Sequence, residues 1–250
     1  MDRPSLGVSI FIVGEDEKLW DEEARQARAI GAEHLALYLE YPPGNGRLRE
    51  RQIRRLKNAT KGAKLLVQAP SSWPSLITPH EELLRLSRQE LKETLGVAAK
   101  LGAALVILHG ESNPFPLLRD LQDADARFSE GVRELLPLAR QLGLALAIEN
   151  PARGYPATPE ELERALALGL KLSLALDQAR AGGPAQLARW ERFAARSACV
   201  VLGPQQEPEV APLREAGFTG FLTLRFPAHA GRWAEVREAL ARLKASWDGS

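Results

Sequence analysis

The chain has 250 residues, of which 45% are hydrophobic and 26% are charged, and its 33 lysine and arginine residues nearly balance 32 aspartate and glutamate residues. This composition excludes a disordered chain and gives no overall positive field for nucleic acid, and the lone Cys199 excludes an internal disulfide framework or a thiolate metal cluster. Because no apolar run approaches the roughly 20 residues that cross a bilayer, we expect a soluble, cytoplasmic protein without membrane or nucleic-acid partners, folded as one domain over residues 1–250.

Eight short apolar runs, each typical of a buried strand, alternate along the chain with longer amphipathic segments. In chain order the runs cover residues 7–13, 35–39, 65–68, 105–109, 145–149, 172–177, 199–202 and 221–225. The clearest helical segments between them cover residues 20–30, 81–100, 126–142, 159–167 and 232–244. In the segment 81–100, Leu84, Leu91 and Leu95 share one face at helical spacing, with charged residues opposite.

The residues at the ends of these segments support the same assignment of strands and helices. Thr158 and Glu161 have the spacing of a helix-capping pair, and Pro159 stands at the first helical position. At five places a glycine follows a helical segment and precedes a strand, where a left-handed residue turns the chain: Gly31, Gly102, Gly143, Gly169 and Gly217.

Strands that alternate with helices must pair in parallel through crossover helices. Eight such units without a linker, charge block or low-complexity segment predict a single (β/α)8 barrel, the TIM barrel fold. The alternative, an open doubly wound sheet, usually carries a glycine-rich phosphate loop after its first strand, and Gly14-Glu15-Asp16 is not such a loop.

Polar residues end several of the apolar runs, and in a barrel these ends meet in the mouth, where active sites are built. Each such group is expected to be desolvated and to need a partner. The residues are Gln68, His109, Glu149, Asn150, Asp177, Arg180 and Arg225. Trp73, in the loop after the third strand, is a further candidate to cover a pocket.

Five strand segments in succession resemble the xylose-isomerase-like barrel superfamily, which includes sugar isomerases, sugar epimerases and metal-dependent apurinic endonucleases. The segments are LLVQAP, GAALVILHG, LGLALAIEN, LSLALDQARAGG and AGFTGFLTLRF. The resemblance extends from about Gly7 to Phe226. It implies the barrel fold and a divalent-metal centre built from ligands at the strand ends.

Some residues match the ligands that the resemblance implies. Glu149 matches the fifth-strand glutamate, and Asn150 matches the asparagine that commonly follows it. Asp177 matches the sixth-strand aspartate, and His109 matches the fourth-strand histidine.

Other residues depart from the implied pattern. Gln68 stands at the place of the third-strand histidine, and Arg180 at the place of the histidine after the sixth-strand aspartate. The seventh strand offers no histidine, and Arg225 stands where the eighth-strand glutamate would complete the metal site.

These departures argue against a metal cofactor. Two carboxylates with water bind a divalent cation weakly, and a guanidinium at a ligand position repels it. Glu149 and Asp177 still need a positive partner when buried, which Arg225 or Arg180 can supply by bidentate pairing. We therefore expect no cofactor and Arg225 in the space of the metal; the alternative is a Mn²⁺ or Zn²⁺ ion held by Glu149 and Asp177.

The first functional hypothesis is a divergent sugar or sugar-phosphate isomerase or epimerase. In it Glu149, His109 and Asp177 are the catalytic candidates, and the substrate-binding candidates are Gln68, Asn150, Arg180, Arg225 and Trp73. The second is a non-catalytic barrel that binds a small carbohydrate or an anionic metabolite. The third, ranked lowest, is a metal-dependent apurinic endonuclease. Whether the chain is an active enzyme and whether it forms a homodimer stay open.

Other residues that sometimes carry chemistry have simpler interpretations here. His34, His80 and His229 are expected at the surface, and the tryptophans of the helical segments are expected to pack. The preference for arginine over lysine and the 17 prolines are typical of a thermophilic source.

Overall fold

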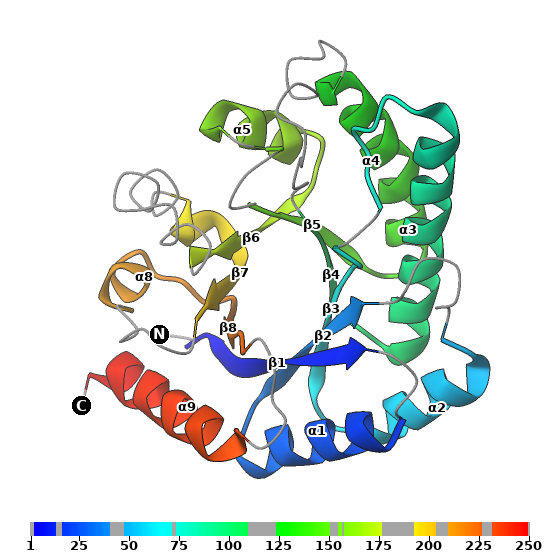
Figure 1. The fold of residues 1–250 in the computed structure, drawn as a ribbon. Helices are drawn as coiled ribbons and strands as arrows, with labels where there is room; N and C mark the ends of the chain where they lie inside the picture. Colours follow the sequence, from blue (N-terminus) through cyan, green and yellow to red (C-terminus); the bar gives the residue numbers. More distant parts are fainter. Residues whose placement is uncertain are drawn as a thin grey trace.

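The computed structural model describes residues 3–13, 17–40, 48–71, 74–109, 124–150, 155–156, 158–176, 193–203, 210–226 and 232–249. Within these ranges the strands form a closed parallel barrel in chain order, so the predicted (β/α)8 fold is confirmed (Figure 1). The strands are β1 (Ser5–Val13), β2 (His34–Glu40), β3 (Lys64–Gln68), β4 (Leu105–Leu108), β5 (Ala145–Glu149), β6 (Lys171–Ala175), β7 (Ser197–Leu202) and β8 (Phe221–Leu224).

Helices surround the barrel (Figure 1). In the described part of the chain they are α1 (Glu17–Ala29), α2 (Glu50–Ala59), α3 (Glu81–Leu101), α4 (Ala124–Gln141), α5 (Pro159–Ala167), the short α8 (Ala211–Glu215) and α9 (Trp233–Asp248), with a 3₁₀ turn η2 (Ala194–Arg196). None of the helices that the structure describes is long and apolar enough to span a membrane.

The predicted helix ends are confirmed. The Thr158 side chain accepts a hydrogen bond from the backbone N–H of Glu161, and the Glu161 side chain accepts one from the backbone N–H of Thr158. The five glycines that precede strands all have φ values between 69° and 103°, which only glycine adopts readily.

The alternation of side chains along the strands produces two cores. The outer core packs the outward strand residues against the helices and includes Leu37, Val106 and Ile148 with Trp20 and Phe128 of the helices. The inner core fills the barrel and comprises Ala36, Tyr38, Leu66, Leu105, Ile107, Ala147, Ala175, Cys199 and Val201.

The inside of the barrel is polar on the side formed by β8, β1 and β2. Ser9, His34 and Thr223 are all fully buried there. His34 was expected at the surface, and this expectation is wrong: its imidazole lies inside the barrel, where Nε2 is 2.8 Å from Thr223 Oγ1. His80, by contrast, is exposed at the start of α3, as expected.

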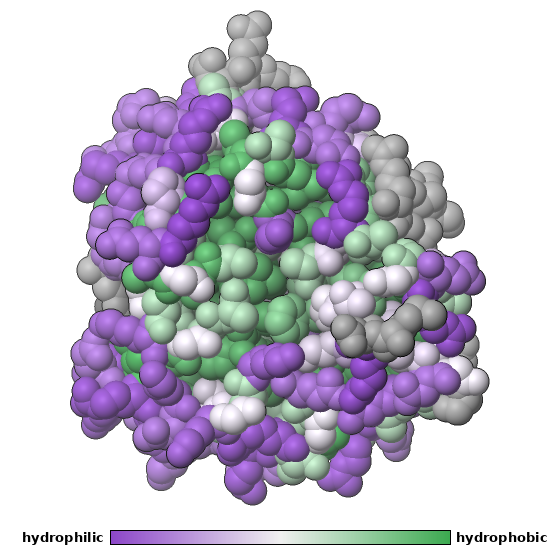
Figure 2. Space-filling model, turned by 180° about the vertical axis from the view of Figure 1, so that it is seen from behind, coloured by the Kyte–Doolittle hydropathy of each residue, from purple (hydrophilic) through white to green (hydrophobic). Residues whose placement is uncertain are grey.

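The surface of the helices carries the charges. Seen from the opposite side to Figure 1, hydrophilic residues surround a broad apolar area (Figure 2). Ion pairs connect neighbouring helices, among them Arg55 with Asp21 at 2.6 Å and Lys92 with Glu134. Because these pairs are solvent-exposed, we expect them to add little to stability at physiological ionic strength.

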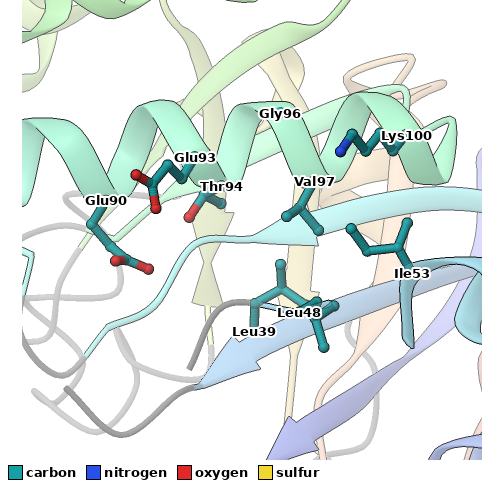
Figure 3. Close-up of a pocket in the computed structure, with 9 residues that line it drawn as sticks. All are labelled: Leu39, Leu48, Ile53, Glu90, Glu93, Thr94, Gly96, Val97 and Lys100. Atoms are coloured by element: carbon teal, nitrogen blue, oxygen red, sulfur yellow. The ribbon is translucent and has the colours of Figure 1, made fainter. Parts of the chain in front are cut away.

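A hollow of about 360 Å³ lies on the outer wall, between α2 and α3 (Figure 3). Its floor is apolar, with Leu39, Ile53 and Val97, and Lys100 stands at one end. Gly96, in the middle of α3, also lines it. The hollow lies outside the barrel and does not include the polar residues that end the strands.

Replacement of Gly96 by alanine is expected to stabilise the protein. A Cβ atom at this position meets no atom of the neighbouring elements within 4 Å, and alanine is favoured over glycine in a helix interior by about 1 kcal/mol. Chemical denaturation should show a higher free energy of unfolding for Gly96→Ala. Gly131→Ala in α4 is the matched control, because its Cβ would lie 2.8 Å from Leu76 Cδ2 and the gain should be absent. Equal effects of the two substitutions would contradict this account.

Candidate functional site

The carboxyl ends of five strands bring polar side chains together in the mouth of the barrel. The residues are Tyr38 of β2, Gln68 of β3, His109 directly after β4, Glu149 of β5 and Arg225 directly after β8. Four of them were predicted as site residues from the sequence. Contacts between neighbouring pairs join the five into one network.

Glu149 is the most buried member, with only 1% of its side chain exposed. Its Oε1 accepts a hydrogen bond from Arg225 Nη1 at 3.1 Å and lies 3.4 Å from His109 Nδ1. A buried carboxylate needs an opposite charge close by, and Arg225 supplies it. The predicted ion pair of Glu149 with Arg225 is therefore present, through the single Nη1–Oε1 hydrogen bond rather than the expected bidentate pairing.

His109 lies between Gln68 and Glu149. Gln68 Nε2 is 2.9 Å from His109 Nε2, while His109 Nδ1 faces Glu149 Oε1. This arrangement fits a neutral imidazole that carries its proton on Nδ1 and accepts a hydrogen bond from the Gln68 amide at Nε2. Burial lowers the pKa of His109 to about 4, with a further contribution from the Arg225 charge and an opposing one from Glu40. His109 is therefore neutral at pH 7.

Tyr38 is a site residue that the sequence analysis missed. Its hydroxyl accepts a hydrogen bond from Arg225 Nη1 at 3.2 Å, and the guanidinium carbon lies 5.9 Å from its ring centre. The ring also stacks on Phe11, with 4.6 Å between the centroids. Tyr38 lies within the apolar run 35–39, two residues before the end of β2. In the sequence, the only sign that its side chain points into the barrel is its spacing of two residues from Glu40, since residues two apart in a strand share one face.

Glu40 marks the rim of the mouth. Its carboxylate accepts hydrogen bonds from the Ser71 backbone N–H, at 3.0 Å, and from the Ser71 hydroxyl, at 2.5 Å. These contacts fasten the segment after β3 to the end of β2, next to the strand end that carries Gln68.

Asn150 is fully buried beside Glu149, and its amide contacts the end of β6. Its Oδ1 accepts a hydrogen bond from the Ala175 N–H at 2.6 Å, and its Nδ2 donates one to the Ala175 carbonyl at 3.3 Å. In this structure Asn150 holds β5 and β6 together; its predicted contact with a substrate stays a prediction. Trp73, Asp177 and Arg180 lie outside the described residues.

The described residues do not fit a divalent metal ion. Among them, no group of three histidine, cysteine, aspartate or glutamate side chains lies close enough to hold one. Glu149 and His109 are neighbours, but the Glu149 Oε1 atom that faces His109 also accepts the hydrogen bond from the Arg225 guanidinium. A metal at this point would have to displace a fixed positive charge.

The fold is a (β/α)8 barrel, and its polar cluster lies at the carboxyl ends of the strands, where barrels of this class carry their active sites. Residues 24–169 match the family described as xylose isomerase-like TIM barrel, and the chain belongs to this family. The resemblance inferred from the strand motifs is thereby confirmed. None of the proteins with curated descriptions matches the sequence.

Solved structures of the same fold include two sugar epimerases and a nuclease. The 3-keto-D-glucoside 4-epimerase YcjR from E. coli is 15% identical, with a TM-score of 0.72 over 97% of this chain and 100% of the other. The D-psicose 3-epimerase from Clostridium cellulolyticum, solved with D-tagatose, is 16% identical, with a TM-score of 0.74 over 96% and 98%. Endonuclease IV from Thermus thermophilus is 21% identical, with a TM-score of 0.68 over 96% and 99%. At these identities the likeness shows the fold.

The two buried histidines are expected to make the protein less stable in acid. Burial and, to a smaller extent, the Lys64 charge lower the pKa of His34 to about 3, and the pKa of His109 is lowered to about 4. Between these values and the ordinary histidine pKa of about 6.5, the unfolded chain binds protons that the folded chain does not. The contribution of the two histidines to the free energy of unfolding should therefore be complete above pH 6.5 and should decrease as the pH falls toward 4. Glu23 opposes this trend, because burial raises its pKa to about 7, so the histidine contribution is read from the difference between variants.

Denaturation at a series of pH values tests this expectation. His34→Gln should reduce the slope of stability against pH in this range, because the substituted side chain does not titrate. The same slope in His34→Gln as in the unchanged protein would refute the assignment of a neutral, buried His34.

Proposed function

We propose that this protein is a divergent sugar isomerase or epimerase that binds a small carbohydrate in the barrel mouth and works without a divalent metal. The observation that carries the proposal is the Arg225–Glu149 pair at 3.1 Å, with His109 next to it at the edge of the mouth. A neutral imidazole can accept a proton from the carbon beside a carbonyl, a fixed guanidinium can stabilise the charge that develops on oxygen, and the buried carboxylate can orient both.

The similar solved structures support a carbohydrate as the ligand. The two epimerases described above act on sugars, and one of them was solved with D-tagatose. Sugars carry several hydroxyl groups, each of which can donate and accept hydrogen bonds. In the mouth the partly exposed side chains of His109 and Arg225 can take part in such bonds, and Gln68 and Tyr38 lie buried behind them as their hydrogen-bond partners.

In the proposed reaction each residue has a stated task. His109 accepts the proton from the carbon next to the substrate carbonyl, and the electron pair of that bond forms the carbon–carbon double bond of an enediolate. Arg225 donates hydrogen bonds to the oxygen on which negative charge develops. Glu149 holds the Nδ1–H of His109 and the guanidinium in place. Return of a proton to the same carbon from the opposite face inverts that centre. In an isomerisation the proton goes instead to the former carbonyl carbon, while the proton of the neighbouring hydroxyl moves to the former carbonyl oxygen, so that the carbonyl changes place. Asp177 is proposed as a second proton carrier.

One observation favours binding without turnover as a second candidate. The pKa of His109 is lowered to about 4, and its Nε2 is within 2.9 Å of Gln68 Nε2. A weakly basic imidazole with both nitrogens engaged is a poor proton acceptor until the substrate rearranges these contacts. A nuclease function has the weakest support, because the net charge is +1 and the implied histidine ligands are mostly replaced.

Metal analysis tests the absence of a metal. The purified protein should contain no stoichiometric Mn²⁺ or Zn²⁺, also after incubation with either ion. Arg225→Glu removes the positive charge and restores a carboxylate, and it should therefore gain measurable affinity for these ions by calorimetry. Arg225→Gln is the matched control, because it removes the charge without adding a ligand. Stoichiometric metal in the unchanged protein, or no gain in Arg225→Glu, would contradict the proposal.

Hydrogen exchange at carbon tests the reaction. Incubated in D₂O with a panel of ketoses and aldoses, the protein should catalyse incorporation of deuterium next to the carbonyl of one of them, as detected by NMR. His109→Asn should lower the rate by about 10²-fold or more, whereas His80→Asn at the exposed start of α3 should not. Sugar binding without exchange would favour the second candidate. Neither binding nor exchange would overturn both.

A further inference from the structure

Two hydrogen bonds join β2 to β8 and to the residue directly after it, although β1 lies between the two strands in the sheet. Inside the barrel, at the start of β2 and farther from the mouth, His34 Nε2 is 2.8 Å from Thr223 Oγ1. At the mouth, Arg225 Nη1 is 3.2 Å from the Tyr38 hydroxyl. Since β1 pairs with β2 on one side and with β8 on the other, both contacts pass across its inner face.

The residues of β1 make this crossing possible. Its inward positions below Phe11 are small: Ser5, Gly7 and Ser9. A Cβ atom on Gly7 would lie 2.5 Å from Cγ of the His34 ring and 2.3 Å from the His34 carbonyl oxygen. The imidazole therefore lies directly against the Gly7 backbone, in space that any other residue would fill.

His34 is held on all sides. Its Nδ1 is 3.1 Å from Ser5 Oγ, its Nε2 faces Thr223, and its ring meets Phe221 edge-on with 5.1 Å between the centroids. It is fully buried, and its low pKa keeps it neutral. Two oriented hydrogen bonds fix a direction, which an apolar side chain of the same volume would not do.

Thr223 lies on β8, in contact with His34 and farther from the mouth than Arg225. It lies two residues before Arg225, so both side chains point to the inside of the barrel and Arg225 stands one layer above. The end of β8 is also held by hydrogen bonds from the Arg225 N–H to the Leu202 carbonyl, at 2.8 Å, and from the Phe226 N–H to Ser9 Oγ, at 3.2 Å.

We infer that His34 is a positioning residue of the mouth: through Thr223 it sets the place of β8, so that Arg225 reaches both Glu149 and Tyr38. The inference rests on the proposed use of Arg225 as the fixed cation of the site. His34 itself lies below the site, and a substrate in the mouth does not touch it.

The titration of His109, followed by NMR of the imidazole signals, tests this inference without any substrate. Arg225 lowers the pKa of His109, so a displaced guanidinium should let this pKa rise. Thr223→Val keeps the shape of the side chain and removes the hydroxyl, and it should raise the pKa of His109 by about one unit. Arg225→Gln gives the shift in the pKa of His109 that is expected for full loss of the charge. Thr223→Ser keeps the hydroxyl and should leave the pKa of His109 at the value of the unchanged protein. A His109→Asn variant identifies the signal.

Cys199→Ala is the matched control. The Cys199 thiol lies 3.5 Å from Thr223 Oγ1, and its removal leaves the bond between His34 and Thr223 intact, so the pKa of His109 should not change. His34→Gln is the second variant if Thr223→Val does not fold, and it should raise the same pKa. An unchanged pKa of His109 in a folded Thr223→Val or His34→Gln protein, beside a raised one in Arg225→Gln, would overturn the inference and leave His34 a purely structural residue. Because no sugar is present, failure of the proposed function would not alter this readout.

Discussion

The mouth of the barrel depends on one constraint: the carboxylate of Glu149 is buried at the end of β5 and needs a positive charge beside it. In relatives with a complete ligand set, the resemblance implies that a metal ion meets this need. Here Arg225 meets it from β8, with Nη1 at 3.1 Å. A guanidinium differs from a metal ion because it is covalently anchored, planar and always charged. It does not exchange with the medium, and its direction is set by the strand that carries it.

The other residues of the mouth adapt to this pair. His109 lies next to the positive charge and stays neutral, with its Nδ1 toward the carboxylate. Gln68 then meets the remaining ring nitrogen with its amide, at 2.9 Å. Tyr38 places its hydroxyl and its ring against the guanidinium. The result is a continuous polar network at the mouth, above an interior that is itself polar on the side of β8, β1 and β2. The partly exposed edges of His109 and Arg225 face the opening.

The sequence predicts the barrel well because its signals are local. The order of strands and helices, the capping pair at Thr158 and the glycines at helix ends all follow from short-range spacing. The same reasoning finds Gln68, His109, Glu149 and Arg225, since each ends an apolar run. Tyr38 was missed because an aromatic residue inside an apolar run is typical of a core. His34 was misplaced because its burial depends on Gly7, a residue distant in sequence that leaves room for the ring. Such pairings between strands become visible only when the barrel closes.

The narrow inner face of β1 has a consequence for how this barrel can vary. A Cβ at position 7 would lie 2.5 Å from Cγ of the His34 ring and 2.3 Å from the His34 carbonyl oxygen. The contact with the carbonyl oxygen is present whatever side chain stands at position 34, so loss of the ring would not make room for a side chain at position 7. In barrels with the same strand register we therefore expect position 34 to vary while position 7 stays glycine.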